Sequence, residues 1–249
     1  MHTHIHNASG SYWLHSPRTL IMAGRRGLDI YLDLLSQPCR AIHIFVNVNK
    51  IPHTLKTVAL RKGEQKTPDF AKLNPMQKVP VIDDNGFVLT ESDAILKYLA
   101  TKYHVPDHWY PKQPERRARV DEYTAWHHTN TRPQAAKVFL LEVLLPRMAG
   151  QPTEQARVER AVSELSVTLD KLQDMFLKRQ PFLCGDDISL ADLLAVCELM
   201  QPLGGGRDVL QDRPVLQRWL GRVQSAVGSS FDEAHAVLYR VRDNAKAKL

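Results

Sequence analysis

The chain has 249 residues, 43% of them hydrophobic, which is enough to bury the core of one large domain or two small ones. No apolar run approaches the roughly 20 residues that span a bilayer, so we expect a soluble protein without a membrane partner. The net charge is +6, but Arg18, Arg25 and Arg26 supply half of it. The remainder is spread along the chain and does not indicate nucleic-acid binding.

Residues 1–26 differ from the rest, because they lack acidic residues and show no sustained periodicity. Three interpretations stay open: a disordered extension, an artefact of cloning or of upstream translation, or a transit peptide, which is typically poor in acids. His2, His4 and His6 alternate in this segment. We predict no metal site there, since no neighbouring groups would orient these side chains.

The pattern becomes regular at residue 28. Alternating apolar residues in "LDIYLDLL" predict a strand over 28–35, and helical spacing in "QPCRAIHIFVNVN" predicts a helix over 37–49. Pro38 suits its first turn, where the missing N–H group costs nothing. A second strand is expected in "HTLKTVAL", residues 53–60, and a short helical turn in "TPDFAKLNP". The first strand, helix and second strand together make a βαβ unit.

Two short strands are predicted at Val79–Ile82 and Phe87–Leu89, on either side of "DDNG", which favours a tight turn. Pro80 is unusual inside a strand because it cannot donate to the sheet, so we predict a cis Val79–Pro80 bond at a change of chain direction. A helix over Ser92–Tyr103 follows. The order βαβ and then ββα predicts a mixed four-stranded sheet with helices.

The proline-containing segment "HVPDHWYPKQP" predicts a linker, and everything after it reads as helical. We therefore expect an α/β domain over 27–104, a linker over 105–113 and an all-α domain over 114–249. Helices are predicted over 115–131, 134–145, 153–179, 190–200, 214–227 and 231–246. In "DISLADLLAVCEL", Ser189 and Asp192 fit a capping box, which we interpret as structural.

The three cysteines, Cys39, Cys184 and Cys197, are odd in number and widely spaced. They form no CxxC pair or Cys/His cluster, so we predict neither a zinc site nor a disulfide framework. This favours a reducing compartment, and we expect the cytoplasm or the nucleus. An organelle is the alternative if residues 1–26 are a transit peptide.

The element order resembles the thioredoxin fold, and the helical half with "SLADLL" resembles the glutathione transferase family. The stretches "IYLDLLSQPCRA", "NPMQKVPVI", "LTESDAIL", "RARVDEY" and "ISLADLLAVCELM" are similar to its theta class. The resemblance covers roughly residues 27–245. It implies a thioredoxin-like domain that binds glutathione as co-substrate, a helical domain that contributes the electrophile pocket, a homodimer and no metal.

The resemblance implies that glutathione pairs with the backbone of Val79 and that Glu91 and Ser92 hold one of its ends. Free amides and the positive dipole end at a helix start favour a carboxylate, while Glu91 suits an ammonium group. The alternative for Ser92 is a helix N-cap only. Class members often carry a histidine after the second strand, where this chain has Gln65, with Lys78 as a nearby cation.

Arg132 in "HHTNTRP" matches an arginine near the active site of the class. Pro133 follows it and is expected to disfavour helical geometry at Arg132. The resemblance implies that this pocket takes alkyl and arylalkyl halides, sulfate esters, epoxides and organic hydroperoxides.

Ser36 just precedes the first predicted helix, where its hydroxyl can donate to the glutathione sulfur and lower the thiol pKa. We therefore expect Ser36 to be the catalytic residue of a glutathione transferase with peroxidase activity. One alternative is a thiol transferase that uses Cys39 as nucleophile, although a cysteine after Pro38 more often packs as a buried hydrophobe. Another is a non-catalytic protein of the same fold that carries ligands or binds partners.

Overall fold

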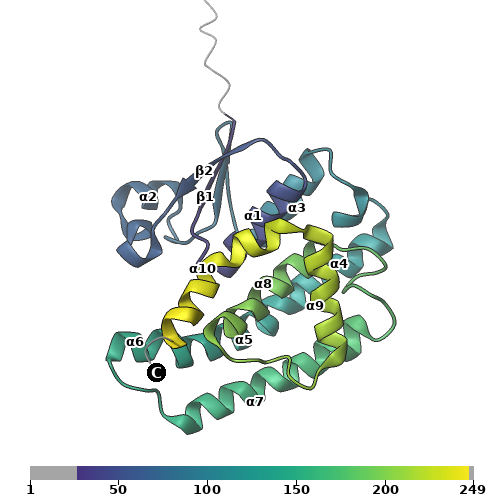
Figure 1. Ribbon diagram of the computed structural model, residues 1–249. Coiled ribbons are helices and arrows are strands. Elements are labelled where there is room, and N and C mark those ends of the chain that lie inside the picture. Colours follow the sequence, from purple (N-terminus) through teal and green to yellow (C-terminus); the bar gives the residue numbers. More distant parts are fainter. Residues whose placement is uncertain (1–26, 247–249) are drawn as a thin grey trace, which may run out of the picture.

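The computed structural model describes residues 27–246, and Figure 1 shows a sheet domain beside a helical domain. The predicted extension, with His2, His4 and His6, lies outside the described residues. No helix between residues 27 and 246 is long and apolar enough to cross a membrane.

The sheet has four strands in the order β2-β1-β3-β4: β1 Leu28–Leu32, β2 His53–Thr57, β3 Val81–Asp84 and β4 Phe87–Thr90. Strand β1 runs parallel to β2 and antiparallel to β3, which is antiparallel to β4. The mixed sheet predicted from the βαβ and ββα order is therefore confirmed. The pairing brings the end of β1, the start of β3 and the end of β4 to the same end of the sheet.

Strand β1 is shorter than predicted and β3 is shifted by two residues along the chain, both for local reasons. Strand β1 ends at Leu32 because Asp33 turns the chain: its carboxylate accepts from Leu35 N at 2.9 Å and its carbonyl from Ser36 N at 2.9 Å. Strand β3 begins at Val81 and not at Val79, since Pro80 has no N–H group to donate to a sheet. The predicted cis Val79–Pro80 bond is confirmed.

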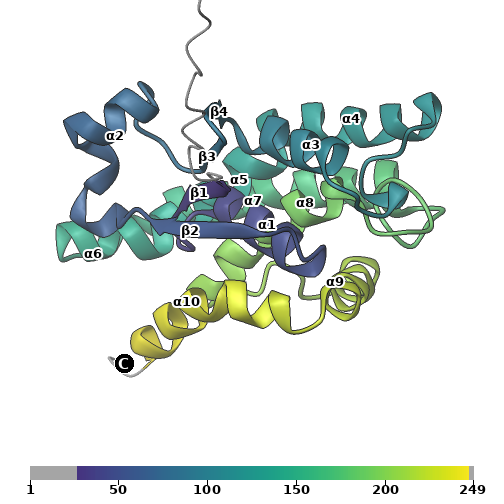
Figure 2. The same ribbon diagram turned by 90° about the horizontal axis from the view of Figure 1, so that it is seen from above.

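Three helices cover the sheet: α1 Gln37–Val48, α2 Pro68–Leu73 and α3 Ser92–Lys102. Helices α1 and α3 pack together, and α1 also contacts the helical domain. On the other face of the sheet, Phe70 of α2 packs against Tyr31 of β1, so the strands lie between α2 and α1 (Figure 2). Both faces of the sheet are therefore covered.

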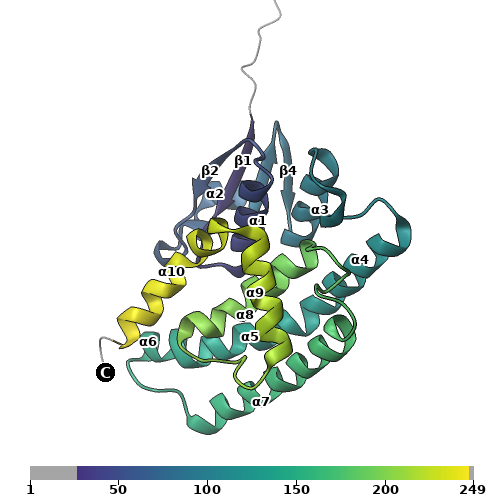
Figure 3. The same ribbon diagram turned by 45° about the vertical axis from the view of Figure 1, so that its right-hand side comes forward.

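Long helices make up the second half, with two π-helical turns named η4 and η5. Their bounds are α4 Pro114–Thr129, α5 Thr131–Phe139, η4 Leu140–Leu144, α6 Leu145–Ala149, α7 Gln155–Leu172, η5 Gln173–Leu177, α8 Leu190–Gly205, α9 Pro214–Val227 and α10 Ser229–Lys246. Helix α8 is almost wholly buried, and it packs against α1, α5 and α10 (Figure 3). It is the central helix of the molecule and extends past the predicted end at residue 200.

The predicted capping box at the start of α8 is confirmed. One oxygen of the Asp192 carboxylate accepts from the N–H of Ser189 at 2.9 Å and from its hydroxyl at 3.0 Å. The other accepts from Leu183 N at 2.9 Å and from the indole of Trp219 at 2.8 Å. Asp192 is fully buried and therefore joins the helix start, the preceding loop and α9.

The segment predicted to be a linker contains a 3-10 turn, η3 Asp107–Trp109. Trp109 is only 2% exposed and packs edge-on against Phe45 of α1, with ring centroids 5.5 Å apart. Tertiary packing therefore holds this proline-containing segment against the sheet domain, and a single core runs through both halves of the chain.

We expect Gly204→Ala to destabilise the protein. An added Cβ would lie 2.6 Å from the Cβ of Leu238 on α10, an atom too close to the backbone to swing away. Such overpacking costs about 1–3 kcal/mol, measurable by denaturant unfolding. The matched control is Gly221→Ala on α9, where a Cβ meets nothing within 4 Å, so that variant should be neutral or slightly stabilised. Equal stability of the two variants would contradict this prediction.

Candidate active site

Ser36 occupies the N-cap of α1 in an extended conformation, with φ −84° and ψ 126°. It is half-buried, and within residues 27–246 its hydroxyl forms no capping hydrogen bond with the first turn. The first amides of a helix point outward without intrahelical partners, and Pro38 at this helix start has no N–H group. Ser36 therefore presents a hydroxyl that does not cap the helix, next to the positive end of a helix dipole and beside the buried Cys39 thiol.

Asp33 ties the Ser36 turn to the loop after β2. One carboxylate oxygen accepts from Leu60 N at 2.9 Å, in the 3-10 turn η1 Leu60–Lys62. Gln65 follows in the next turn, η2 Glu64–Lys66, and its Oε1 is buried with no hydrogen-bond partner among the described residues. An unsatisfied buried acceptor is costly, so Gln65 is suited to receive a donor from a ligand.

Val79 lies just before β3, next to the start of α3. The pairing of Val81 with Thr90 places the Val79–Pro80 bond beside Glu91 and Ser92. Within the described residues the backbone groups of Val79 form no hydrogen bond, so they are free to pair with an extended peptide. Lys78 precedes it with an exposed side chain, and its carbonyl accepts from Asn74 Nδ2 at 2.7 Å.

Glu91, and not Ser92, is the N-cap of α3, so the N-cap alternative for Ser92 was wrong. Glu91 is exposed and has a positive φ of 65°, which is unusual for a residue with a side chain. Such backbone strain is often found at ligand sites. The first intrahelical bond runs from Ile95 N to Glu91 O at 2.9 Å, which leaves the amides of the first turn available.

Arg132 lies in the first turn of α5, with helical geometry despite Pro133. The expectation that Pro133 would disfavour this geometry was wrong, because a proline in the first turn loses no intrahelical hydrogen bond. The Arg132 Nη1 donates to Glu198 Oε1 on α8 at 2.6 Å. The side chain of Arg132 is 40% exposed and that of Glu198 1%, so the buried Glu198 binds an arginine that stays accessible. Burial raises the pKa of Glu198 to about 7.

An apolar face continues along the helix from Arg132, and it was missed in the sequence. Ala136, Leu140 and Leu144 follow Arg132 at intervals of four residues, with Leu140 40% and Leu144 42% exposed. Residues four apart are neighbours on the surface of an α-helix, so Ala136 follows Arg132 on α5, and Leu140 and Leu144 begin and end the π-helical turn η4 that continues it. That spacing was visible from the sequence, but their exposure was not.

Cys39 belongs to the core and has no exposed surface, although its thiol neighbours Ser36. Burial raises the pKa of its thiol to about 11, so the side chain is neutral at physiological pH. Thiolates are the nucleophilic form of cysteine. Among residues 27–246 no group of three or more His, Cys, Asp or Glu side chains could hold a metal ion.

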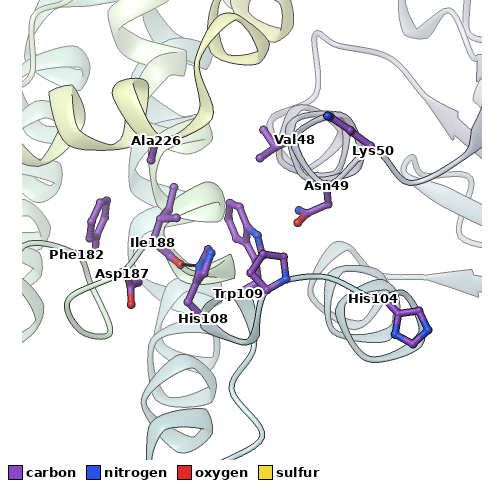
Figure 4. Close-up of a pocket in the computed structure, with 11 residues that line it drawn as sticks. Val48, Asn49, Lys50, His104, His108, Trp109, Phe182, Asp187, Ile188 and Ala226 are labelled. Atoms are coloured by element: carbon purple, nitrogen blue, oxygen red, sulfur yellow. Dashed lines mark hydrogen bonds between the residues drawn. The ribbon is translucent and has the colours of Figure 1, made fainter.

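A pocket of about 450 Å³ lies at the other end of α1. Figure 4 shows the residues that line it. Val48, Asn49, His108, Trp109 and Ile188 are among its lining residues. Helix α1 has 12 residues and is therefore about 18 Å long, so this cavity is separate from Ser36. It contains none of the predicted site residues.

Comparison with known proteins agrees with this arrangement. The model of the glutathione S-transferase N-terminal domain matches residues 36–102, and that of the C-terminal domain matches residues 132–226. Glutathione S-transferase theta-1 of Bos taurus is 50% identical over 222 residues, which cover 89% of this chain and 92% of that protein. The protein of the same name from Homo sapiens is 49% identical, over 87% of this chain and 91% of its own.

Solved structures agree as well. Human glutathione-S-transferase T1-1 in its apo form has a TM-score of 0.84 at 48% identity, covering 87% of this chain and 91% of that one. A human theta-class transferase in complex with the glutathione conjugate of 1-menaphthyl sulfate also has a TM-score of 0.84, at 42% identity over 90% and 91%. With both domain models matched and half of the residues shared, this chain belongs to the theta class of the glutathione S-transferase family.

Proposed function

We propose that this transferase conjugates glutathione to small electrophiles and that Ser36 activates the glutathione thiol. The observation that carries the proposal is the shared end of the sheet, close to the Ser36 hydroxyl, the unpaired backbone of Val79 and the first-turn amides of α3. Glutathione is an extended tripeptide with carboxylates at both ends, an ammonium group and a thiol. Each of these groups has a chemically matched partner at this end of the sheet.

The binding roles follow from those matches. The backbone of Val79 would pair with the cysteinyl part of glutathione. The amide and hydroxyl of Ser92 would hold a carboxylate at the helix start, and Glu91 would take the ammonium group. Gln65 and Lys78 would bind the other end of the peptide, through a hydrogen bond and a positive charge.

The reaction requires a thiolate, and a free thiol with a pKa of roughly 8.5 is only a few per cent ionised at neutral pH. A hydrogen bond from Ser36 and the dipole of α1 both stabilise the charged sulfur. The sulfur attacks an electrophilic carbon, a carbon–sulfur bond forms, and the leaving group departs with the electron pair of its broken bond. The thiol proton is released to solvent.

The electrophile would lie between Ser36 and α5. Arg132 offers a cation for a leaving sulfate or halide, and Leu140 and Leu144 offer an apolar surface to the organic part. The complex of the human relative with a 1-menaphthyl sulfate conjugate favours arylalkyl sulfates, beside alkyl halides and epoxides. With organic hydroperoxides, sulfur would attack oxygen and release the alcohol, and a second glutathione would yield glutathione disulfide and water.

The Cys39 route is disfavoured by the burial of that thiol and its raised pKa. A non-catalytic carrier has no specific observation in its favour. The predicted homodimer would bury the outer strand β4, where Phe87 is 49% and Val88 41% exposed. A cytoplasmic location stays a prediction from the cysteine content.

The proposal is tested by glutathione-dependent turnover of an alkyl halide, an arylalkyl sulfate and an organic hydroperoxide. Full-length protein and a form lacking residues 1–26 are compared, and both should turn over at least one of these substrates at similar rates. Cys39→Ala is the matched control and should keep its activity. Binding of glutathione without turnover of any substrate would contradict the proposal and favour a carrier.

A further inference from the structure

Arg40 is a buried arginine on α1, four residues after Ser36, and its side chain has no exposed surface. Its Nη1 donates to the carbonyl of Leu34 at 2.8 Å and to that of Leu35 at 3.3 Å. These are the two residues that precede Ser36. The guanidinium therefore holds the turn that presents the Ser36 hydroxyl.

The other half of the guanidinium reaches the helical domain. Its Nη2 donates to the carbonyl of Cys197 at 2.8 Å and to Gln201 Oε1 at 2.6 Å, both on α8. The planar fork of arginine suits such simultaneous contacts on two sides. Arg40 thus joins the Ser36 turn directly to the central helix of the molecule.

The charged groups around Arg40 come from four elements. Asp33 lies on the turn itself, and its carboxylate accepts from Leu35 N and Leu60 N. On α8, the Glu198 carboxyl is engaged by Arg132, and burial raises the pKa of the Cys197 thiol to about 12. On α10, burial lowers the pKa of His235 to about 3, which leaves it neutral. The Cys39 thiol on α1 is neutral as well.

Of these groups, Glu198 is the carboxyl whose charge acts on the Arg40 guanidinium, while Asp33 lies on the turn that carries Ser36. We propose that Arg40 is a positioning residue for the thiolate site, which aims the Ser36 hydroxyl and adds a buried positive charge beside the turn where the glutathione thiolate forms. This inference rests on the proposed contact between Ser36 and the glutathione sulfur. Without Arg40, the turn would keep the negative charge of Asp33 and lose this positive charge, which disfavours ionisation of the thiol.

The test is the thiol pKa of enzyme-bound glutathione, followed by the ultraviolet absorbance of the thiolate and by the pH profile of kcat/KM. Arg40→Met should raise this pKa by roughly one unit, the scale of removing a nearby charge at intermediate dielectric. Its kcat/KM should fall roughly tenfold below the thiol pKa and recover as the pH rises above it. Arg40→Lys keeps the positive charge but loses the two-sided guanidinium contacts. It should therefore leave the thiol pKa unchanged and lower kcat.

Two further variants separate this role from stability. Ile44→Val shortens a buried side chain on the same helix and should lower the melting temperature without moving the thiol pKa. Asp33→Asn should shift the thiol pKa downward, opposite to Arg40→Met, and it keeps the test open if Arg40→Met does not fold. An unchanged thiol pKa in Asp33→Asn, or in folded Arg40→Met, would overturn the inference. So would full kcat in Arg40→Lys. Unchanged turnover in Ser36→Ala would instead refute the proposed function.

Discussion

Ser36→Ala should lower kcat/KM for glutathione conjugation at least tenfold at neutral pH. Loss of a hydrogen bond to a charged transition state typically costs this much or more. The fold should barely respond, because the Ser36 hydroxyl forms no capping bond to α1 and so contributes little to stability. The pH profile should move with it, since a thiol without its donor ionises at higher pH.

The measurement is steady-state kinetics with an alkyl halide, together with thermal unfolding of the same preparations. Ser36→Thr is the matched control, since it retains a hydroxyl at the same backbone position and should keep part of the activity. Wild-type turnover in Ser36→Ala at unchanged melting temperature would show that the serine does not activate the thiol.

Asp192→Ala should destabilise the protein by about 3 kcal/mol or more, because a buried donor without a partner costs about 1–3 kcal/mol and this carboxylate serves several. The variant leaves the amides of Leu183 and Ser189 and the indole of Trp219 without an acceptor. Since these groups belong to a loop, a helix start and α9, the loss should affect the whole helical domain. Denaturant unfolding measures the change.

Asp186→Ala is the matched control for Asp192→Ala. This aspartate precedes the same helix but is exposed, so its loss should change the free energy of unfolding by less than about 0.5 kcal/mol. A similar free energy of unfolding for both variants would mean that the buried carboxylate does not organise the start of α8.

Much of the fold could be predicted because it depends on local patterns. Alternating apolar residues predicted β1, and helical spacing predicted α1 and the long C-terminal helices. The chemistry of proline set the cis bond before β3. Ser189 and Asp192 predicted the start of α8, since a capping box needs only two residues three positions apart. Each of these features is encoded within a few neighbouring positions.

Features that depend on distant partners could not be predicted. Arg40 looks like a surface residue of an amphipathic helix until α8 supplies acceptors about 160 positions later, 157 to Cys197 and 161 to Gln201. The geometry of Arg132 could not be predicted from Pro133 alone, because it depends on α5 beginning at Thr131. The proposed role of Ser36 came from resemblance to a family and from its position before a helix. The strand pairing, which could not be predicted, shows that Val79 and the start of α3 lie at the same end of the sheet.

The single core through both halves has a consequence for the evolution of this protein. Trp109, Phe45 and the buried face of α1 belong to one interior, so the thioredoxin-like half cannot be exchanged as an independent module. Changes of substrate preference are then most easily made at exposed positions such as Leu140 and Leu144, which lie outside this shared interior. Diversification would be expected to concentrate on the surface of one helix, while the machinery that handles glutathione stays constant.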